Sequence, residues 1–334
     1  MSASRARIVK TPSQHPGIKR HAKSSKDPTP SASTEATTIA TWIRKAARRL
    51  SRSDATGNLF FGHGALNAVD EAAWIAAHSC RLSPLRLEAH LARPMAAMEI
   101  RRADSVIANR IADRIPLAYL LGEAWLDGFR FKVDTRVIVP RSLIVECMRE
   151  QFSPWIADSR GLGRVLDLCT GSGCLAILAA RTFPNARVDA VDISVDALEV
   201  ARQNIVLHRM NNRVRAVRSD LFEGLGSRRY DLIISNPPYV DAKSMRALPS
   251  EYRREPELAL AGGSDGLDLI RRILIEARRH LKPAGLLVME IGHNRRVLER
   301  AFPRVPFVWL ETSAGPDKIF ILPAEDLPLP EITG

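Results

Sequence analysis

The stretch from Arg164 to Cys174 reads Arg-Val-Leu-Asp-Leu-Cys-Thr-Gly-Ser-Gly-Cys, and it indicates the fold. Residues 164–168 form a short apolar run typical of a buried strand, and Gly171 and Gly173 predict a tight turn into a helix over 173–183. Further strands are predicted over 187–192, 213–219, 230–235 and 285–291, helices over 194–208 and 267–281, and a closing hairpin over 307–311 and 318–322. Alternating strands and helices predict an α/β fold, in which helices cover both faces of a mostly parallel sheet.

The chain before this sheet has a different pattern. Residues 1–35 hold seven Lys or Arg and two acidic residues but few large apolar ones, which predicts a disordered basic tail. Residues 36–115 predict a helical bundle, with buried stripes at Trp42, Ala46 and Leu50 and at Leu66, Val69, Ala73 and Ala76. Residues 116–140 predict a β-hairpin linker, because Phe129, Phe131 and Val133 alternate beside glycines. We expect the α/β domain over 141–325 and a C-terminal tail over 326–334.

Composition narrows the class of protein. The chain has 334 residues and a formal net charge of +12, which favours a polyanionic partner or a ribonucleoprotein environment and suits a weak contact with RNA. No apolar run is long enough for a membrane span, and the start of the chain lacks the apolar centre of a signal peptide. The four cysteines form no Cys-x-x-Cys pair, so we expect reduced thiols, no metal site and a cytoplasmic location.

A nucleoside-binding site is predicted where the strands end. Glycines at a strand-to-helix turn let the backbone approach a ligand closely, and Asp192 at the end of the second strand can accept ribose hydroxyls. Asp220 ends the third strand beside Leu221, which suits an adenine amine and its ring face. The pattern Gly171-x-Gly173-x-x-Ala176 also satisfies a dinucleotide fingerprint, so a nicotinamide-dependent oxidoreductase stays an alternative. The candidate cofactor-binding residues are Asp167, Cys169, Thr170, Gly171, Ser172, Gly173, Asp192, Asp220, Leu221 and Asn236.

The fourth strand is followed by Asn236-Pro237-Pro238-Tyr239, the strongest local signal in the chain. Prolines restrict the backbone, so the Asn236 side-chain oxygen and the Pro237 carbonyl are expected to project rigidly as two acceptors. Two such acceptors can hold the N–H bonds of a planar nitrogen and favour localisation of its lone pair. We therefore predict Asn236, Pro237 and Tyr239 as catalytic residues and Asn236 to Tyr239, including Pro238, as the substrate-binding segment. A glutamine amide and an adenine amine both fit this chemistry.

These two loops together resemble those of the protein-(glutamine-N5) methyltransferases. The resemblance implies a Rossmann-like, seven-stranded class I methyltransferase domain with an N-terminal helical substrate-recognition domain. It also implies S-adenosyl-L-methionine as cofactor, with S-adenosyl-L-homocysteine as product.

The sequence is similar to one branch of that family in particular, the branch that modifies a glutamine of ribosomal protein uL3. Four stretches carry this similarity: Phe61–Gly64 with Asp70–Ala72, Val139–Ser142, Asn236–Asp241, and Leu248–Leu258 with Asp265–Leu267. The branch that modifies release factors usually has Pro-Arg-Pro-Asp-Thr-Glu where this chain has Val139-Pro-Arg-Ser142. The resemblance implies uL3 as protein substrate, and a release-factor methyltransferase or an N6-adenine nucleic-acid methyltransferase remains as an alternative.

Overall fold

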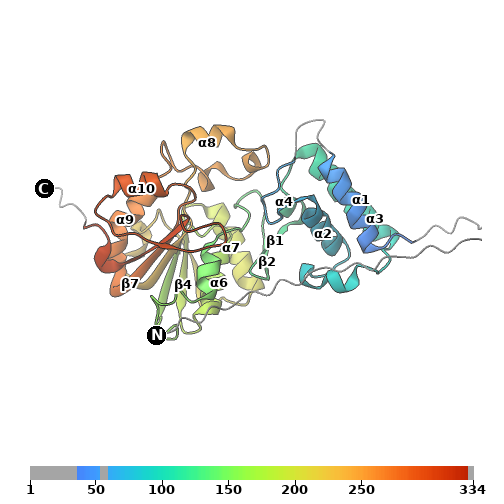
Figure 1. The fold of residues 1–334 in the computed structure, drawn as a ribbon. Coiled ribbons are helices and arrows are strands. Elements are labelled where there is room, and N and C mark those ends of the chain that lie inside the picture. The colour runs from blue at the N-terminus through green and yellow to red at the C-terminus, as the bar shows by residue number, and fades with distance from the viewer. Residues whose placement is uncertain (1–35, 53–58, 330–334) are drawn as a thin grey trace, which may run out of the picture. The chain divides into compact units, whose positions relative to one another are not determined.

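The computed structural model describes residues 36–52 and 59–329, and Figure 1 shows the fold. The tail predicted over 1–35 lies outside the described residues, as do residues 330–334 of the predicted C-terminal tail. Leu327, at the start of that predicted tail, is buried in the core. Within the described ranges, every helix is too short or too polar to traverse a lipid bilayer.

Among the described residues, four helices build the N-terminal bundle; three lie within the predicted range 36–115 and the fourth lies in the predicted linker. Thr38 caps the first helix, and the Asn67 side chain accepts hydrogen bonds from the amides of Val69 and Asp70 at the start of the second. Trp42, Ala46 and Leu50 all point into the bundle core. The helices are α1 (Ile39–Ser51), α2 (Ala68–Ser79), α3 (Ala97–Asp113) and α4 (Leu117–Leu121), with 3₁₀ turns η2 (Pro84–Arg86) and η3 (Glu88–His90) between α2 and α3.

The second predicted stripe is wrong at two of its four positions. Leu66 precedes the helix and is 87 % exposed, and Val69 is 57 % exposed. The helix begins only after Asn67, and it turns Ala72 and Ile75 into the core together with the predicted Ala76. The start of the helix after its cap residue, Asn67, therefore decides which side chains face the core, and the spacing of apolar residues alone does not give that start.

The predicted hairpin joins the bundle to the sheet. Strands β1 (Glu123–Leu126) and β2 (Phe129–Lys132) pair antiparallel, and Asp127 and Gly128 both have positive φ, as a two-residue hairpin turn requires. The short helix α4 also lies within the segment that we expected to be linker. Asn204 ties β2 to the later domain, because its amide exchanges hydrogen bonds with the backbone of Lys132 and donates to the Ser172 carbonyl.

The seven-stranded sheet has the order β5-β4-β3-β6-β7-β9-β8. Strands β3 to β7 are parallel, whereas β9 is antiparallel to both β7 and β8. The chain adds strands to one side of β3 and then returns to its other side, so the carboxyl ends of β3, β4 and β6 meet at a topological switch point. The strands are β3 (Arg164–Leu168), β4 (Arg187–Asp192), β5 (Val214–Arg218), β6 (Tyr230–Ser235), β7 (Leu281–Glu290), β8 (Val308–Leu310) and β9 (Ile319–Pro323).

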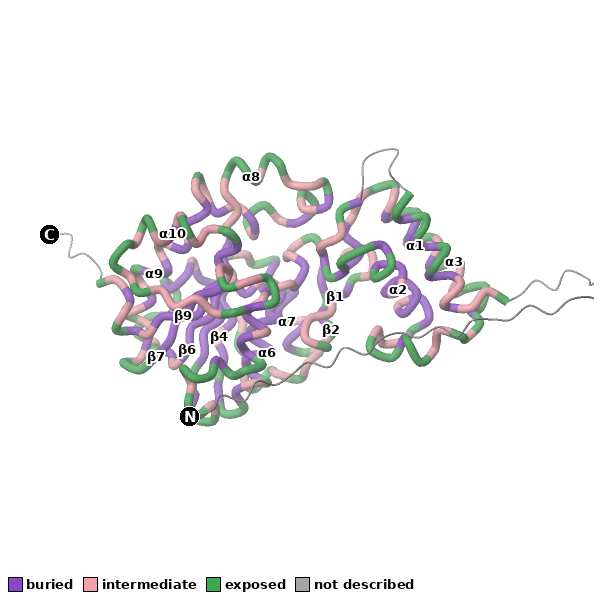
Figure 2. Tube along the Cα trace, in the orientation of Figure 1, coloured by how far each residue is buried: buried purple, intermediate pink, exposed green. Residues whose placement is uncertain are grey.

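Helices cover both faces of this sheet, as the alternating pattern predicts. Val165 faces a core shared with α5 (Ile144–Arg149) and α6 (Cys174–Thr182), whereas its neighbour Leu166 faces a core shared with α9 (Asp268–His280) and α10 (Arg295–Ala301). Figure 2 shows the strands buried between these layers. The remaining elements are α7 (Val195–Leu207), α8 (Ala242–Ala247), and the 3₁₀ turns η4 (Glu223–Leu225), η5 (Tyr252–Arg254), η6 (Glu257–Ala259) and η7 (Ala324–Asp326).

Candidate active site

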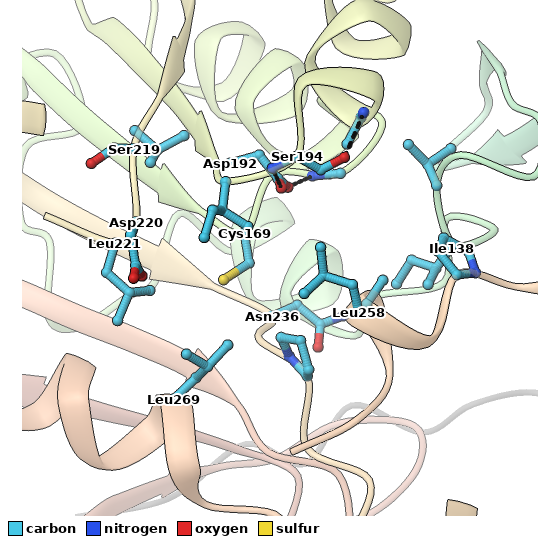
Figure 3. Close-up of a pocket in the computed structure, with 18 of the residues that line it drawn as sticks. Ile138, Cys169, Asp192, Ser194, Ser219, Asp220, Leu221, Asn236, Leu258 and Leu269 are labelled. Carbon is cyan, nitrogen blue, oxygen red and sulfur yellow. Dashed lines mark hydrogen bonds between the residues drawn. The ribbon is translucent and has the colours of Figure 1, made fainter. Parts of the chain in front are cut away.

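A cavity lies at the carboxyl ends of the parallel strands, at the switch point of the sheet. Figure 3 shows Cys169, Asp192 and Asn236 around it. Seven of the residues predicted from the sequence line this cavity: Cys169, Gly171, Asp192, Asp220, Leu221, Asn236 and Pro238. Six others do not line it: Asp167, Thr170, Ser172, Gly173, Pro237 and Tyr239.

Gly171 and Asp192 form the polar part of the cavity. Gly171 has a φ of +53°, and a Cβ added there would meet nothing within 4 Å, so its backbone is open to a ligand. Its amide donates to Asp192 Oδ2 at 2.9 Å, and the Ser194 amide donates to Asp192 Oδ1 at 2.9 Å. Burial raises the pKa of Asp192, and these two hydrogen bonds, which act to lower the pKa, only partly offset that rise. Each carboxylate oxygen keeps a further lone pair, so the fixed side chain can accept hydroxyl groups of a ribose.

Asp167 lies beneath the glycine loop, fully buried. Its Oδ2 accepts from the Thr170 hydroxyl and, at 3.0 Å, from the Ala176 amide, so it holds the loop from below. Burial raises the pKa of Asp167 to about 7. Gly173 lies against α7, where an added Cβ would be 3.1 Å from the Ala201 Cβ. These residues shape the loop, and the cavity wall is formed by its exposed edge.

The far wall of the cavity is mostly apolar, with one ion pair. Leu221, Leu258 and Leu269 line it, and Arg272 Nη1 lies 3.0 Å from Asp220 Oδ1. Sequence reasoning did not assign Leu258 to the site, although it lies in one of the four family-like stretches. Nothing in the sequence pointed to Arg272, because helix spacing places it on α9 without indicating what it faces. The other lining residues that we missed are Arg136, Val137, Ile138, Val191, Ile193, Ser194, Ala197, Ser219, Pro256, Ala259 and Leu269.

The Asn-Pro-Pro-Tyr loop leaves two acceptors free. Among the described residues, neither the Asn236 side chain nor the Pro237 carbonyl has a hydrogen-bond partner. The strand before the loop is anchored by Ser235, whose hydroxyl donates to the Leu168 carbonyl at 2.9 Å. The loop therefore presents unpaired acceptors from a fixed base.

Tyr239 is held from two sides. The Asn294 side-chain amide donates to the Tyr239 carbonyl at 2.7 Å. An added Cβ at Gly292 would lie 2.5 Å from the Tyr239 ring, so the glycine permits this close packing. Burial, with the negative charge of Glu290 nearby, raises the pKa of Tyr239, so its phenol stays neutral. Glu290 is itself buried and accepts from the Ser142 hydroxyl at 2.6 Å and from the Leu143 amide at 3.0 Å.

The segment after this loop contacts the helical bundle through a buried acid. Glu251 is fully buried and accepts hydrogen bonds from Arg110 at 3.1 Å, from Arg114 at 3.0 Å and from the Phe60 amide at 3.1 Å. Burial raises the pKa of Glu251, but these hydrogen bonds outweigh it and the pKa is lowered overall. An ionised Glu251 therefore joins the segment to α3.

Glu255 makes a second connection, to the residues at the start of the catalytic domain. Its carboxylate accepts two hydrogen bonds from Arg141, at 2.6 and 2.8 Å, and one from the Val139 amide at 2.9 Å. Burial acts to raise the pKa of Glu255, but His63, whose Nε2 lies 3.7 Å from Oε2, and Arg141 lower it to about 2. Three family-like stretches of the sequence thus meet at one buried carboxylate.

The described residues contain no group of three or more His, Cys, Asp or Glu side chains that could hold a metal ion. An oriented acid, an open glycine and apolar walls surround one cavity, an arrangement that can accommodate a nucleoside.

Two family models match the chain. The methyltransferase small domain matches residues 142–249, and the PrmC N-terminal domain matches residues 41–122. The chain is 49 % identical to the "Ribosomal protein uL3 glutamine methyltransferase" of Neisseria meningitidis serogroup A over 89 % of this chain and 96 % of that protein. The proteins of the same name from Bordetella pertussis and Bradyrhizobium diazoefficiens are 49 % and 46 % identical, each over 88 % of this chain and over 97 % and 92 % of their own lengths.

Proposed function

Because the chain belongs to the family of ribosomal protein uL3 glutamine methyltransferases, we propose that it methylates the side-chain amide nitrogen of a glutamine in uL3. The methyl donor in this proposal is S-adenosyl-L-methionine, which leaves as S-adenosyl-L-homocysteine. The observation that carries the proposal is the pair of acceptors on Asn236 and Pro237, unpaired among the described residues, in the loop whose Asn236 lines the cavity.

The two acceptors address the weakness of an amide as a nucleophile. Its nitrogen lone pair is delocalised over the carbonyl, so an unassisted amide reacts slowly with an alkyl donor. The Asn236 side-chain oxygen and the Pro237 carbonyl oxygen would each accept one N–H bond of the glutamine and hold the nitrogen in line with the methyl group. Their dipoles are oriented before the reaction begins, so they stabilise the positive charge that develops on nitrogen. Tyr239 would pack against the planar amide. One N–H proton of the methylated nitrogen would pass to solvent water after transfer.

The cofactor would be held by the cavity walls. Asp192 would accept the ribose hydroxyls, Gly171 would let the backbone approach, and Leu221 and Leu258 would contact the adenine ring. Asp220 is paired with Arg272, so an adenine amine would share that carboxylate with the guanidinium. When bound, S-adenosylmethionine supplies an electrophilic methyl carbon, so the transfer needs no metal.

The helical bundle, residues 36–115, is proposed to recognise the folded part of the substrate. Its support is the contact of Glu251 with Arg110 and Arg114, which links the bundle to the segment beside the Asn-Pro-Pro-Tyr loop. We also propose a cytoplasmic site of action and a weak contact with RNA, since uL3 is a ribosomal protein.

Labelled methyl transfer tests the proposed function. The enzyme would be incubated with S-[methyl-³H]-adenosylmethionine and, separately, with free uL3, a peptide-release factor and ribosomal RNA. We expect label on uL3 alone, on a glutamine identified by peptide mass spectrometry. Label on the release factor would reassign the substrate, and label that stays in RNA after protease treatment would indicate an adenine methyltransferase.

A further inference from the structure

A basic groove lies between the C-terminal end of α2, the outer side of α3 and the β-hairpin. It encloses about 940 Å³ and shares no lining residue with the cavity of the active site. We call it the basic groove and define it by Ser79, Arg81, Arg101, Arg102, Ser105 and Arg130. Nothing in the proposed reaction uses these residues.

The positive charges of the arginines in the groove are poorly balanced by nearby carboxylates. Arg81, Arg101 and Arg102 are exposed, and none of them forms an ion pair with another described residue. The carboxylate in the groove, Glu123, is already engaged by His78 at 3.2 Å and by Arg130 at 3.4 Å. Three guanidinium groups therefore face one concave surface with their charge unbalanced, which focuses a positive potential there.

A buried hydroxyl in the same groove also lacks a partner. Ser79 is 3 % exposed, and its Oγ makes no hydrogen bond to any described residue. A buried hydroxyl without a partner is unfavourable, so such a group marks a place where a ligand or water completes the site. The exposed arginines offer the donors to an anion with several acceptor oxygens, and Ser79 lies in the wall of the same groove.

We propose that the basic groove binds the phosphate backbone of RNA. A guanidinium group can donate two parallel hydrogen bonds to the oxygens of one phosphate. Contacts with the phosphate backbone need no particular base sequence. A basic protein segment would be repelled by the unbalanced arginines, so the groove favours an anionic occupant. The role of RNA binding in methylation rests on the proposed function. RNA already associated with uL3 would enter the groove while the glutamine enters the active site.

Fluorescence anisotropy with a labelled RNA stem-loop tests the groove, using the full chain at several NaCl concentrations. In the groove variant, Arg101→Glu/Arg102→Glu, we expect an affinity for RNA at least about tenfold lower. The slope of the logarithm of the binding constant against the logarithm of the salt concentration should become shallower by roughly 1 to 2. The matched control, Arg296→Glu/Arg304→Glu, makes the same charge change at exposed arginines outside the groove and should bind RNA almost normally. Circular dichroism checks that both variants are folded.

Three outcomes would overturn the RNA site. Equal loss of affinity in the groove and control variants would show that net charge alone binds RNA. An unchanged salt slope in the groove variant would exclude phosphate contacts there. Displacement of the RNA by a poly-aspartate peptide at a lower concentration than by unlabelled RNA would assign the groove to an acidic protein segment instead.

Methylation of free uL3 separates this inference from the proposed function. Labelling of free uL3 by the unaltered enzyme without RNA reports the proposed function alone, and RNA affinity measured without uL3 reports the groove alone. If the unaltered enzyme bound RNA through the groove but left uL3 unlabelled, the proposed function would fail and the RNA site would stand.

Discussion

Glu251 accepts a hydrogen bond from Arg110 at 3.1 Å, although 141 positions separate the two residues in the chain. Both side chains are buried, and Arg110 also donates to Glu71 on α2 at 3.0 Å. One arginine of the helical bundle therefore holds an acid of its own bundle and an acid of the segment that follows the Asn-Pro-Pro-Tyr loop. This contact connects the part proposed to recognise the substrate with the part proposed to act on it.

Removal of Glu251 should loosen that connection. Glu251→Ala leaves Arg110 and Arg114 without one of their acceptors, and breaking a buried ion pair costs about 3 kcal/mol in the free energy of unfolding. We also expect a raised KM for uL3, because the bundle loses its fixed position beside the site. Urea unfolding and initial-rate kinetics measure the two effects.

The control for Glu251 is an exposed pair on α7. Glu199 lies 3.6 Å from Arg202 with about half of each side chain exposed, so Glu199→Ala should cost less than about 1 kcal/mol. If both variants lost the same stability and kept the same KM, the buried contact would have no coupling role.

Asn236→Ala should nearly abolish transfer. It removes one of the two acceptors for the glutamine amide, and loss of one preorganised group of this kind reduces kcat by about 100- to 1,000-fold. The side chain has no hydrogen bond to another residue that the structure describes, so the melting temperature should change little. Asn212→Ala, at an exposed position, is the control. An Asn236→Ala enzyme with normal kcat would contradict the assigned role.

Gly292→Ala should displace Tyr239. The added methyl group would lie 2.5 Å from the ring, and a shift of about 1 Å in a positioned group can lower kcat about 100-fold. Gly122→Ala is the matched control, because Gly122 also has a positive φ but an added Cβ there meets nothing within 4 Å. Both variants carry a backbone strain of about 1–2 kcal/mol. A similar kcat in the two variants would show that Tyr239 need not be fixed.

Asp167 should make stability fall as the pH rises. The folded protein holds its proton up to a pKa of about 7, whereas the unfolded chain releases it near 3.8. The unfolded state therefore binds fewer protons between these values, so the contribution of Asp167 is complete below pH about 4 and is lost through pH about 7.

Urea unfolding at pH 5 and pH 8 measures this effect. Asp167→Asn should reduce the loss of stability between the two pH values by on the order of 3 kcal/mol. Asp196→Asn, at an exposed position on α7, should leave that difference unchanged. Identical pH profiles for the Asp167→Asn and unaltered proteins would show that Asp167 is ionised in the folded state.

Local sequence signals located most elements of the α/β domain. The strands over 164–168, 187–192 and 230–235 have the predicted bounds, and Ser194 caps α7 as expected. These elements were predictable because buried parallel strands are continuous apolar runs, and because caps and glycine turns are chemical features of single residues. The stripe through Leu66 and Val69 failed because helical spacing does not specify where a helix begins.

The sequence by itself determined the order of strands and helices, the glycine loop, Asp192 and the Asn-Pro-Pro-Tyr loop, since each of these depends on residues adjacent in the chain. Only the tertiary structure decided that Asp167 lies behind the loop, that Arg272 pairs with Asp220, and that Glu251 meets Arg110. The basic groove likewise arises where a helical bundle and a hairpin come together. Contacts between distant segments depend on packing and burial, which no local pattern of residue types encodes.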